Sequence, residues 1–132
     1  MRRADAAALL AASIAAVPAS AGARRHRLHL PPVELPRALT VDEKEWAIRP
    51  SKTLVGTGVV RFTAYNRGED NHNFVIVGPD GHTVGQASVV PGASVIIATP
   101  LRPGTYQLFC SLFAGTPESH YSRGMHTVIT VR

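Results

Sequence analysis

The sequence predicts an all-β fold, a sandwich of two antiparallel sheets with about seven or eight short strands. Three observations lead to this prediction. Apolar residues recur at every second position, or in short continuous runs that suit strands buried on both faces. Glycine and proline separate these runs at roughly regular intervals. No stretch shows the apolar periodicity of a long helix.

The N-terminal residues 1–23 have the composition of a secretory signal peptide. Arg2 and Arg3 precede an apolar run over residues 6–17, and Ala21-Gly22-Ala23 matches a cleavage site. The apolar run is shorter than the ~20 residues that cross a bilayer, which makes a retained membrane anchor the weaker interpretation. We therefore expect export by a cleavable signal peptide to a secreted or periplasmic (cell-envelope) location.

Residues 24–40 form an Arg- and Pro-rich segment that is expected to be an extended leader. Within it, residues 24–37 carry four arginines and one glutamate, so most of the chain's net charge of +5 lies before the strand-rich part. A basic tail on a nearly neutral domain does not indicate a nucleic-acid surface. Contact of the leader with a membrane surface stays an open alternative.

The predicted domain covers residues 41–132, and its first strand is expected over residues 41–48. The acidic cluster 42–45 would face solvent, with Trp46 and Ile48 directed inward. Pro50 would end this strand in a turn. Residues 54–58 are a short apolar piece that two glycines interrupt.

The clearest alternation lies in residues 59–65, where Val60, Phe62 and Ala64 share one face of a predicted strand. A polar loop and a second, fully buried strand follow. Gly78-Pro79-Asp80-Gly81 is a turn signal, because proline presets φ and glycine tolerates positive φ. The remaining strands are expected at residues 74–77, 84–90, 95–98, 106–110 and 127–131.

The only cysteine, Cys110, ends the apolar run at residues 106–110. A single cysteine cannot form an internal disulfide, and an exposed thiol is a liability in an oxidising compartment. Deep burial or metal ligation would explain why Cys110 is present in an exported protein. His120 and Met125 follow before the last strand, and His72 lies where a polar loop meets an apolar strand. One thiolate, two imidazoles and a thioether are the donors of a trigonal His₂Cys copper site with a weak axial methionine.

From about Thr40 onward, the chain resembles the cupredoxin family of small blue copper proteins, such as plastocyanin, azurin and amicyanin. The resemblance implies a Greek-key β-sandwich that holds one copper ion per chain and cycles between Cu(I) and Cu(II). The matching segments are Asn66-x-Gly68, His72-Asn73-Phe74, Pro103-Gly104-Thr105-Tyr106, Phe109-Cys110, His120 and Gly124-Met125.

The resemblance also assigns a role to each candidate ligand. Cys110 would be the thiolate, His72 and His120 the equatorial nitrogens, and Met125 the long axial ligand. His120 would lie toward the surface and offer electrons an exit.

Two further residues have a place in this pattern around the copper. Asn73 would tie the two ligand loops together, with Ser111 as its partner. One departure is the loop of nine residues, 111–119, between Cys110 and His120. Familiar cupredoxins have only a few residues there, so the loop could change the spectroscopic type of the site.

Other interpretations of these residues remain open. Cys110 could be a small buried hydrophobe, Met125 an ordinary core residue, and His126 could replace His120 or Met125 as a ligand. A Cys-His₂ zinc site is chemically feasible but would not need the methionine. A cysteine nucleophile paired with histidine lacks any accompanying oxyanion feature.

The sequence therefore predicts an exported, monomeric electron carrier that exchanges single electrons with redox partner proteins and has no substrate of its own. It is not expected to be a stand-alone enzyme. The alternatives are a copper carrier or storage module that delivers copper to an accepting protein, and a cupredoxin-like interaction domain without metal.

Overall fold

The computed structural model describes residue 28 and residues 30–132 of the chain. The predicted signal peptide and residues 24–27 and 29 of the predicted leader lie outside the described residues. Residues Pro32–Arg132 form one compact unit. Among the described residues, no helix is long and apolar enough to cross a membrane.

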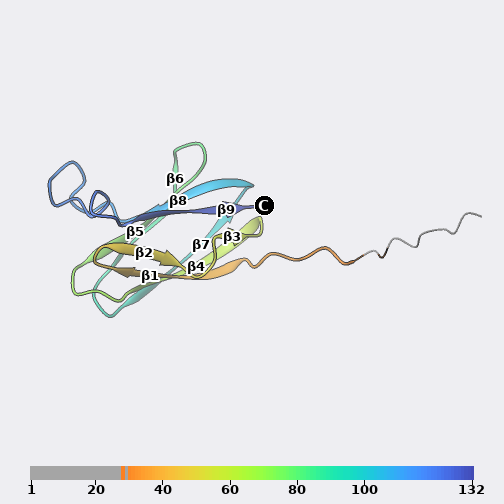
Figure 1. Cartoon of the computed structure of the whole chain (residues 1–132), viewed down its shortest axis with the longest axis horizontal. Coiled ribbons are helices and arrows are strands. Elements are labelled where there is room, and N and C mark those ends of the chain that lie inside the picture. The colour runs from red at the N-terminus through yellow and green to blue at the C-terminus, as the bar shows by residue number, and fades with distance from the viewer. Residues whose placement is uncertain (1–27, 29) are drawn as a thin grey trace, which may run out of the picture. The chain divides into compact units, whose positions relative to one another are not determined.

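The described unit is a sandwich of two β-sheets, which confirms the predicted fold class (Figure 1). One sheet has the strand order β2-β1-β4-β7, and the other has the order β3-β9-β8-β5-β6. The strands are β1 (Ala38–Lys44), β2 (Ala47–Pro50), β3 (Leu54–Val55), β4 (Gly58–Asn66), β5 (His72–Val77), β6 (Thr83–Val89), β7 (Ser94–Leu101), β8 (Gly104–Phe109) and β9 (His126–Val131).

Both sheets are mixed, whereas the sequence predicts antiparallel sheets. β1 pairs with β4 in parallel, and β3 pairs with β9 in parallel; the other strand pairs are antiparallel. The chain leaves the first sheet after β2, adds β3 to the second sheet, and returns to place β4 beside β1. Alternation of apolar residues shows which face of a strand is buried, but it does not encode the direction of its neighbour.

The core lies between the two sheets. In β4, Val60, Phe62 and Ala64 are all fully buried, as the alternation predicts. Phe62 contacts Phe74 of β5 across the sandwich, with ring centroids 5.8 Å apart. Burying one such phenylalanine contributes about 1.5–3 kcal/mol, so this pair helps to hold the two sheets together.

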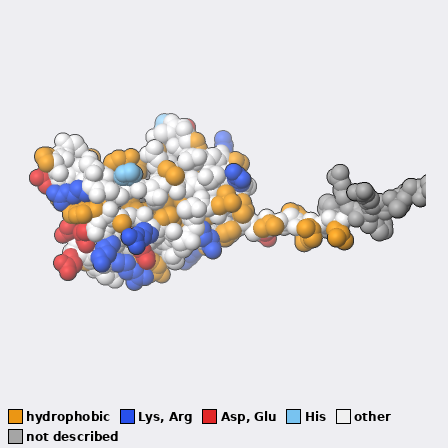
Figure 2. Space-filling view, viewed as in Figure 1, with side chains coloured by type: hydrophobic (Ala, Val, Ile, Leu, Met, Phe, Trp, Pro, Cys, Tyr) orange, Lys and Arg blue, Asp and Glu red, His pale blue; other side chains and the backbone are white. Residues whose placement is uncertain are grey.

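Surface charges of both signs are mixed on the sandwich. On the face that Figure 2 shows, acidic side chains lie next to basic ones. One exposed pair joins Arg67 to Asp42 at 3.3 Å. Exposed ion pairs of this kind contribute at most about 1 kcal/mol, so the apolar core is the main source of stability.

The first predicted strand is wrong in its extent. β1 begins at Ala38, inside the predicted leader, and ends at Lys44. Glu45 and Trp46 form a tight turn, and β2 runs back beside β1, with Lys44 paired to Ala47. The imperfect alternation of this stretch marks a hairpin, which also raises the strand count above the predicted seven or eight.

The predicted exposure of the acidic cluster is also wrong, because Glu43 is fully buried. It follows Leu39 and Val41 on the inward face of β1. Among the described residues, neither of its carboxylate oxygens has a hydrogen-bond partner. Burial raises the pKa of Glu43 from its ordinary value of 4.5 to about 7, because the charged form is poorly solvated there.

This burial predicts a pH-dependent stability difference for Glu43→Gln. A carboxyl whose pKa is raised on folding stabilises the fold fully below the unfolded-state pKa, and this stability is lost as the pH rises toward 7. Between pH 4 and pH 8, the unfolding free energy of the wild type should therefore fall by about 3 kcal/mol relative to the glutamine variant. Urea unfolding of the metal-free proteins across this pH range measures the difference.

Asp42→Asn is the matched control, because Asp42 lies on the exposed face of the same strand. The difference in unfolding free energy between the wild type and Asp42→Asn should not show this pH dependence. A constant stability difference between the wild type and Glu43→Gln from pH 4 to pH 8 would contradict the assignment of Glu43 as a buried carboxyl with a raised pKa.

Candidate metal centre

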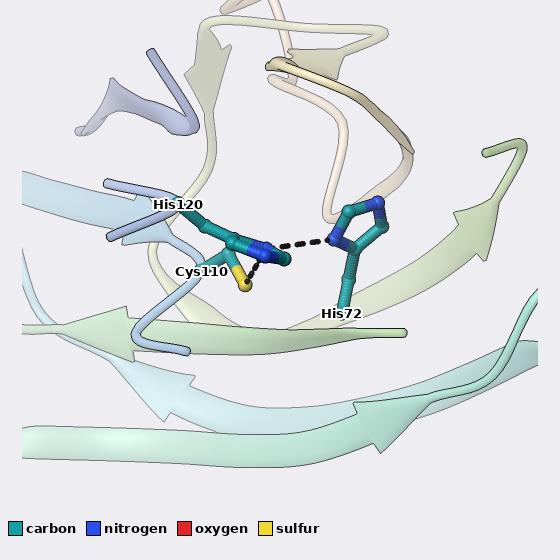
Figure 3. Close-up of side chains that lie close together, drawn as sticks. All are labelled: His72, Cys110 and His120. Carbon is teal, nitrogen blue, oxygen red and sulfur yellow. Dashed lines mark hydrogen bonds between the residues drawn. The ribbon is translucent and has the colours of Figure 1, made fainter. Parts of the chain in front are cut away.

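Three side chains that the sequence singles out converge at one end of the sandwich. Their metal-binding atoms all lie within 4.8 Å of one another, and all three residues are buried. The Cys110 sulfur is 3.4 Å from Nδ1 of His120, and Nδ1 of His72 is 3.2 Å from Nδ1 of His120. Figure 3 shows the two rings and the sulfur directed toward one another.

The strand pairing explains why these residues meet. His72 begins β5, and Cys110 directly follows β8. These strands are antiparallel neighbours, with Val75 opposite Phe109. The start of β5 and the end of β8 therefore lie next to each other at the same end of the sheet.

Backbone hydrogen bonds fix the loop that carries His120. The amide of Cys110 donates to the carbonyl of Met125, and the amide of Met125 donates to the carbonyl of His120. The amide of His120 in turn donates to the carbonyl of Leu112. The loop is thereby closed at its base, and its length does not remove His120 from the cluster.

The surroundings of Cys110 keep its sulfur dry. Its pKa is raised, chiefly by burial and to a lesser degree by the Glu43 carboxylate. The backbone amide of Asn73, 3.4 Å from the sulfur, acts in the opposite direction. A buried thiol of this kind is held protonated until a cation replaces the proton.

The second histidine is prepared as a neutral ligand. Burial, and next the nearby His72, lower the pKa of His120. Metal ions bind the neutral form of imidazole, so less proton displacement opposes binding at this ring.

Asn73 and Ser111, for which the resemblance implies a tie between the ligand loops, are joined by two hydrogen bonds. The side-chain amide of Asn73 donates to Ser111 Oγ at 2.8 Å, and the Ser111 backbone amide donates to Asn73 Oδ1 at 2.7 Å. The residues next to His72 and Cys110 are therefore linked directly.

Met125 and His126 point to opposite sides of the final strand's start. Met125 is fully buried and belongs to the apolar core cluster. His126 is exposed, and its ring stacks on Tyr121 with centroids 4.4 Å apart. His126 is not one of the three converging residues, and ligation by Met125 stays a prediction.

The exposure of His120 differs from the expectation that it lies toward the surface. Only 3% of the residue is exposed. Trp46 packs edge-on against its ring at 4.9 Å, and Phe113, from the long loop, covers it at 5.5 Å. Phe113, one of the residues of the long loop, thus helps to bury the ring.

A hollow of about 710 Å³ lies beside the two histidines. Both histidines contribute to its lining, together with Trp46, Phe113 and Arg123. The guanidinium of Arg123 stacks on the indole of Trp46, 4.5 Å from its centroid. One wall of the hollow, next to the candidate ligands, is therefore aromatic and cationic, and Asp70 and Glu118 also contribute to its lining.

Sequence reasoning missed Glu45, which it placed in a solvent-facing cluster. The carboxylate oxygen Oε1 of Glu45 is 3.0 Å from Nε2 of His72, and it also accepts hydrogen bonds from the backbone amides of Glu69 and Asp70. Burial acts to raise its pKa, but these hydrogen bonds outweigh burial and lower the pKa of Glu45 to about 2. No local pattern reveals this contact, because it depends on the unpredicted turn after β1.

Comparisons with known proteins identify the fold. No family model matches the chain, and no curated protein matches it. Among solved structures, a purple cupredoxin from Nitrosopumilus maritimus is 15% identical, with a TM-score of 0.50 over 72% of this chain and 98% of that one. A reduced amicyanin mutant is 20% identical, with a TM-score of 0.51 over 73% of this chain and 83% of that one.

A multicopper oxidase also matches, with 16% identity and a TM-score of 0.51, over 77% of this chain and 45% of the oxidase. Identities this low establish a common fold and leave the activity to be argued from the site. The chain has the cupredoxin fold, and a buried His-Cys-His cluster lies at one end of its sandwich.

Proposed function

We propose that this protein binds one copper ion through His72, Cys110 and His120 and carries single electrons between redox partners. One observation carries the proposal: a buried thiol and two imidazole nitrogens converge within 4.8 Å. A lone cysteine buried only for packing would not need two histidines directed at its sulfur.

The donor set fits copper well. Thiolate is a soft ligand that favours Cu(I), and imidazole suits both oxidation states. Copper would supply a one-electron couple at this place. Met125 is buried, and its backbone forms hydrogen bonds with Cys110 and His120; it is the proposed axial thioether. A zinc site of the structural type needs four firm ligands, and only three His or Cys donors meet here among the described residues.

The chain's own contribution is a rigid, dry site. The Asn73–Ser111 hydrogen bonds and the backbone hydrogen bonds of Met125 hold the ligand loops in place. Rigid ligands lower the rearrangement that accompanies a change in oxidation state. Trp46 and Phe113 pack against the ring of His120 and help to hold it in place.

Export by residues 1–23, a monomeric state, and exchange with partner proteins complete the proposal. The lone cysteine supports export only in combination with metal binding, which would protect a thiol from oxidation. Copper delivery to an accepting protein remains the second candidate function, and the electrochemical behaviour of the site distinguishes it from electron transfer.

The first prediction concerns Cys110. Stoichiometric Cu(II) should produce an intense visible thiolate-to-copper absorption band that disappears on reduction, with a reversible one-electron couple in voltammetry. Cys110→Ser should abolish the band, because the thiolate is its source. His82→Ala, at an exposed turn, is a control that should leave the spectrum intact.

Unchanged copper binding in Cys110→Ser would refute the proposed site. Tight Cu(I) binding without a reversible couple would instead favour the copper carrier.

A further prediction separates Met125 from His126. Met125→Ala should shift the visible band and the midpoint potential, because the axial ligand tunes the potential. His126→Ala should change neither, since its ring lies outside on Tyr121. Absorption and voltammetry of the two copper-loaded variants measure this. The opposite pattern would assign the ligand role to His126.

A further inference from the structure

We propose that Glu45 is a positioning residue for the metal centre, whose carboxylate holds Nε2–H of His72 and leaves Nδ1 of that ring free to bind the metal. The inference rests on the proposed function for its consequences in the copper-loaded protein. The hydrogen bond between Glu45 and His72, which is the geometric part of the inference, does not depend on a bound metal.

The two nitrogens of His72 face different surroundings. Nδ1 faces the other ring nitrogen of the cluster, 3.2 Å away on His120, whereas Nε2 faces Glu45 Oε1 at 3.0 Å. An ionised carboxylate can only accept hydrogen bonds, so Nε2 must carry the proton. In the neutral imidazole, Nδ1 is then the nitrogen with a free lone pair. This is the tautomer that the proposed site requires.

The loop before His72 holds the Glu45 carboxylate in position through its backbone amides. Glu45 Oε1 accepts hydrogen bonds from the backbone amides of Glu69 at 3.0 Å and Asp70 at 2.9 Å. Asn66 holds this loop, accepting from the Gly68 amide and donating to the carbonyl of Asp70. Glu45 therefore has three donors arranged around one oxygen.

Gly68 provides the space for this arrangement. A Cβ placed on Gly68 would overlap the Glu45 carboxylate. Gly68 does not have a positive φ, unlike several other glycines of the chain. Its role is therefore to leave room for the carboxylate rather than to permit an unusual backbone conformation.

A carboxylate on the far nitrogen of a metal-binding histidine fixes the ring and raises the basicity of the ligand. The more highly charged ion gains more from this than the less charged one. Glu45 should therefore stabilise Cu(II) relative to Cu(I) and hold the midpoint potential down.

Nitrogen NMR of His72 in the metal-free protein at pH 8 tests the geometric part, because it reports which ring nitrogen carries the proton. The wild type should show the Nε2–H tautomer. Glu45→Ala should lose this preference, whereas Glu45→Gln should retain it, because the amide oxygen still accepts. Glu69→Gln is the control, since only the backbone of Glu69 takes part.

Copper binding and voltammetry of the same variants test the electronic part. Glu45→Ala should lower Cu(II) affinity by ~10–100-fold. Glu45→Gln should weaken Cu(II) binding about tenfold more than Cu(I) binding, which corresponds to a potential about 59 mV higher for a one-electron couple. Glu69→Gln should leave both quantities unchanged.

Gly68→Ala gives an independent check. It should reproduce the Glu45→Ala phenotype by displacing the carboxylate, and it should add little further effect in the Glu45→Ala background, where the space is empty. Fully additive effects of the two substitutions would overturn this part of the inference.

The outcomes distinguish this inference from the proposed function. An Nδ1–H tautomer in the wild type, or the same tautomer in wild type and Glu45→Ala, overturns the role of Glu45 whether or not copper binds. The predicted tautomers in a protein that fails to bind copper would support the role of Glu45 and refute the copper proposal.

Discussion

The antiparallel pairing of β5 with β8 is the constraint on which the candidate site depends. It brings the beginning of β5 and the end of β8 to the same end of the five-stranded sheet, with Val75 opposite Phe109. His72 and Cys110 are thus neighbours before any metal binds. Because β5 and β8 are inner strands, flanked by β6 and β9, the two residues are held at the end of the sheet's central strands and not by a loop alone.

Two carboxyl groups of one hairpin show how closely local position governs chemistry. Glu43 and Glu45 share an ordinary pKa of 4.5 and lie two residues apart. Glu43 is directed into the core, where no described residue forms a hydrogen bond with its carboxylate, and burial raises its pKa to about 7. Glu45 lies in the turn, where three hydrogen-bond donors meet it and its pKa falls to about 2. The difference comes from hydrogen bonding, because both groups lose solvent.

The sequence was sufficient for the fold class and for the choice of residues that converge. Period-two alternation in β4 and the single cysteine are strong local signals. The turn at Glu45 is local, with Lys44 paired to Ala47, but its two residues carry no Gly or Pro turn signal. The parallel pairing of β1 with β4 was not accessible from local signals, since it depends on contacts between segments far apart in the chain. The burial of His120 was missed for the same reason, because a loop's length does not show which way it folds.

The turn between β1 and β2 serves both histidines of the cluster. Its two residues are adjacent, yet Glu45 contacts the far nitrogen of His72 and Trp46 packs on the ring of His120. A shift of this turn would therefore disturb both rings together, and the hairpin acts as one support for the site. Phe113, from the long loop, also packs against the ring of His120. In the proposed copper-loaded protein, an electron that leaves through His120 would therefore pass aromatic side chains, and Trp46 and Phe113 would lie between the copper and a redox partner.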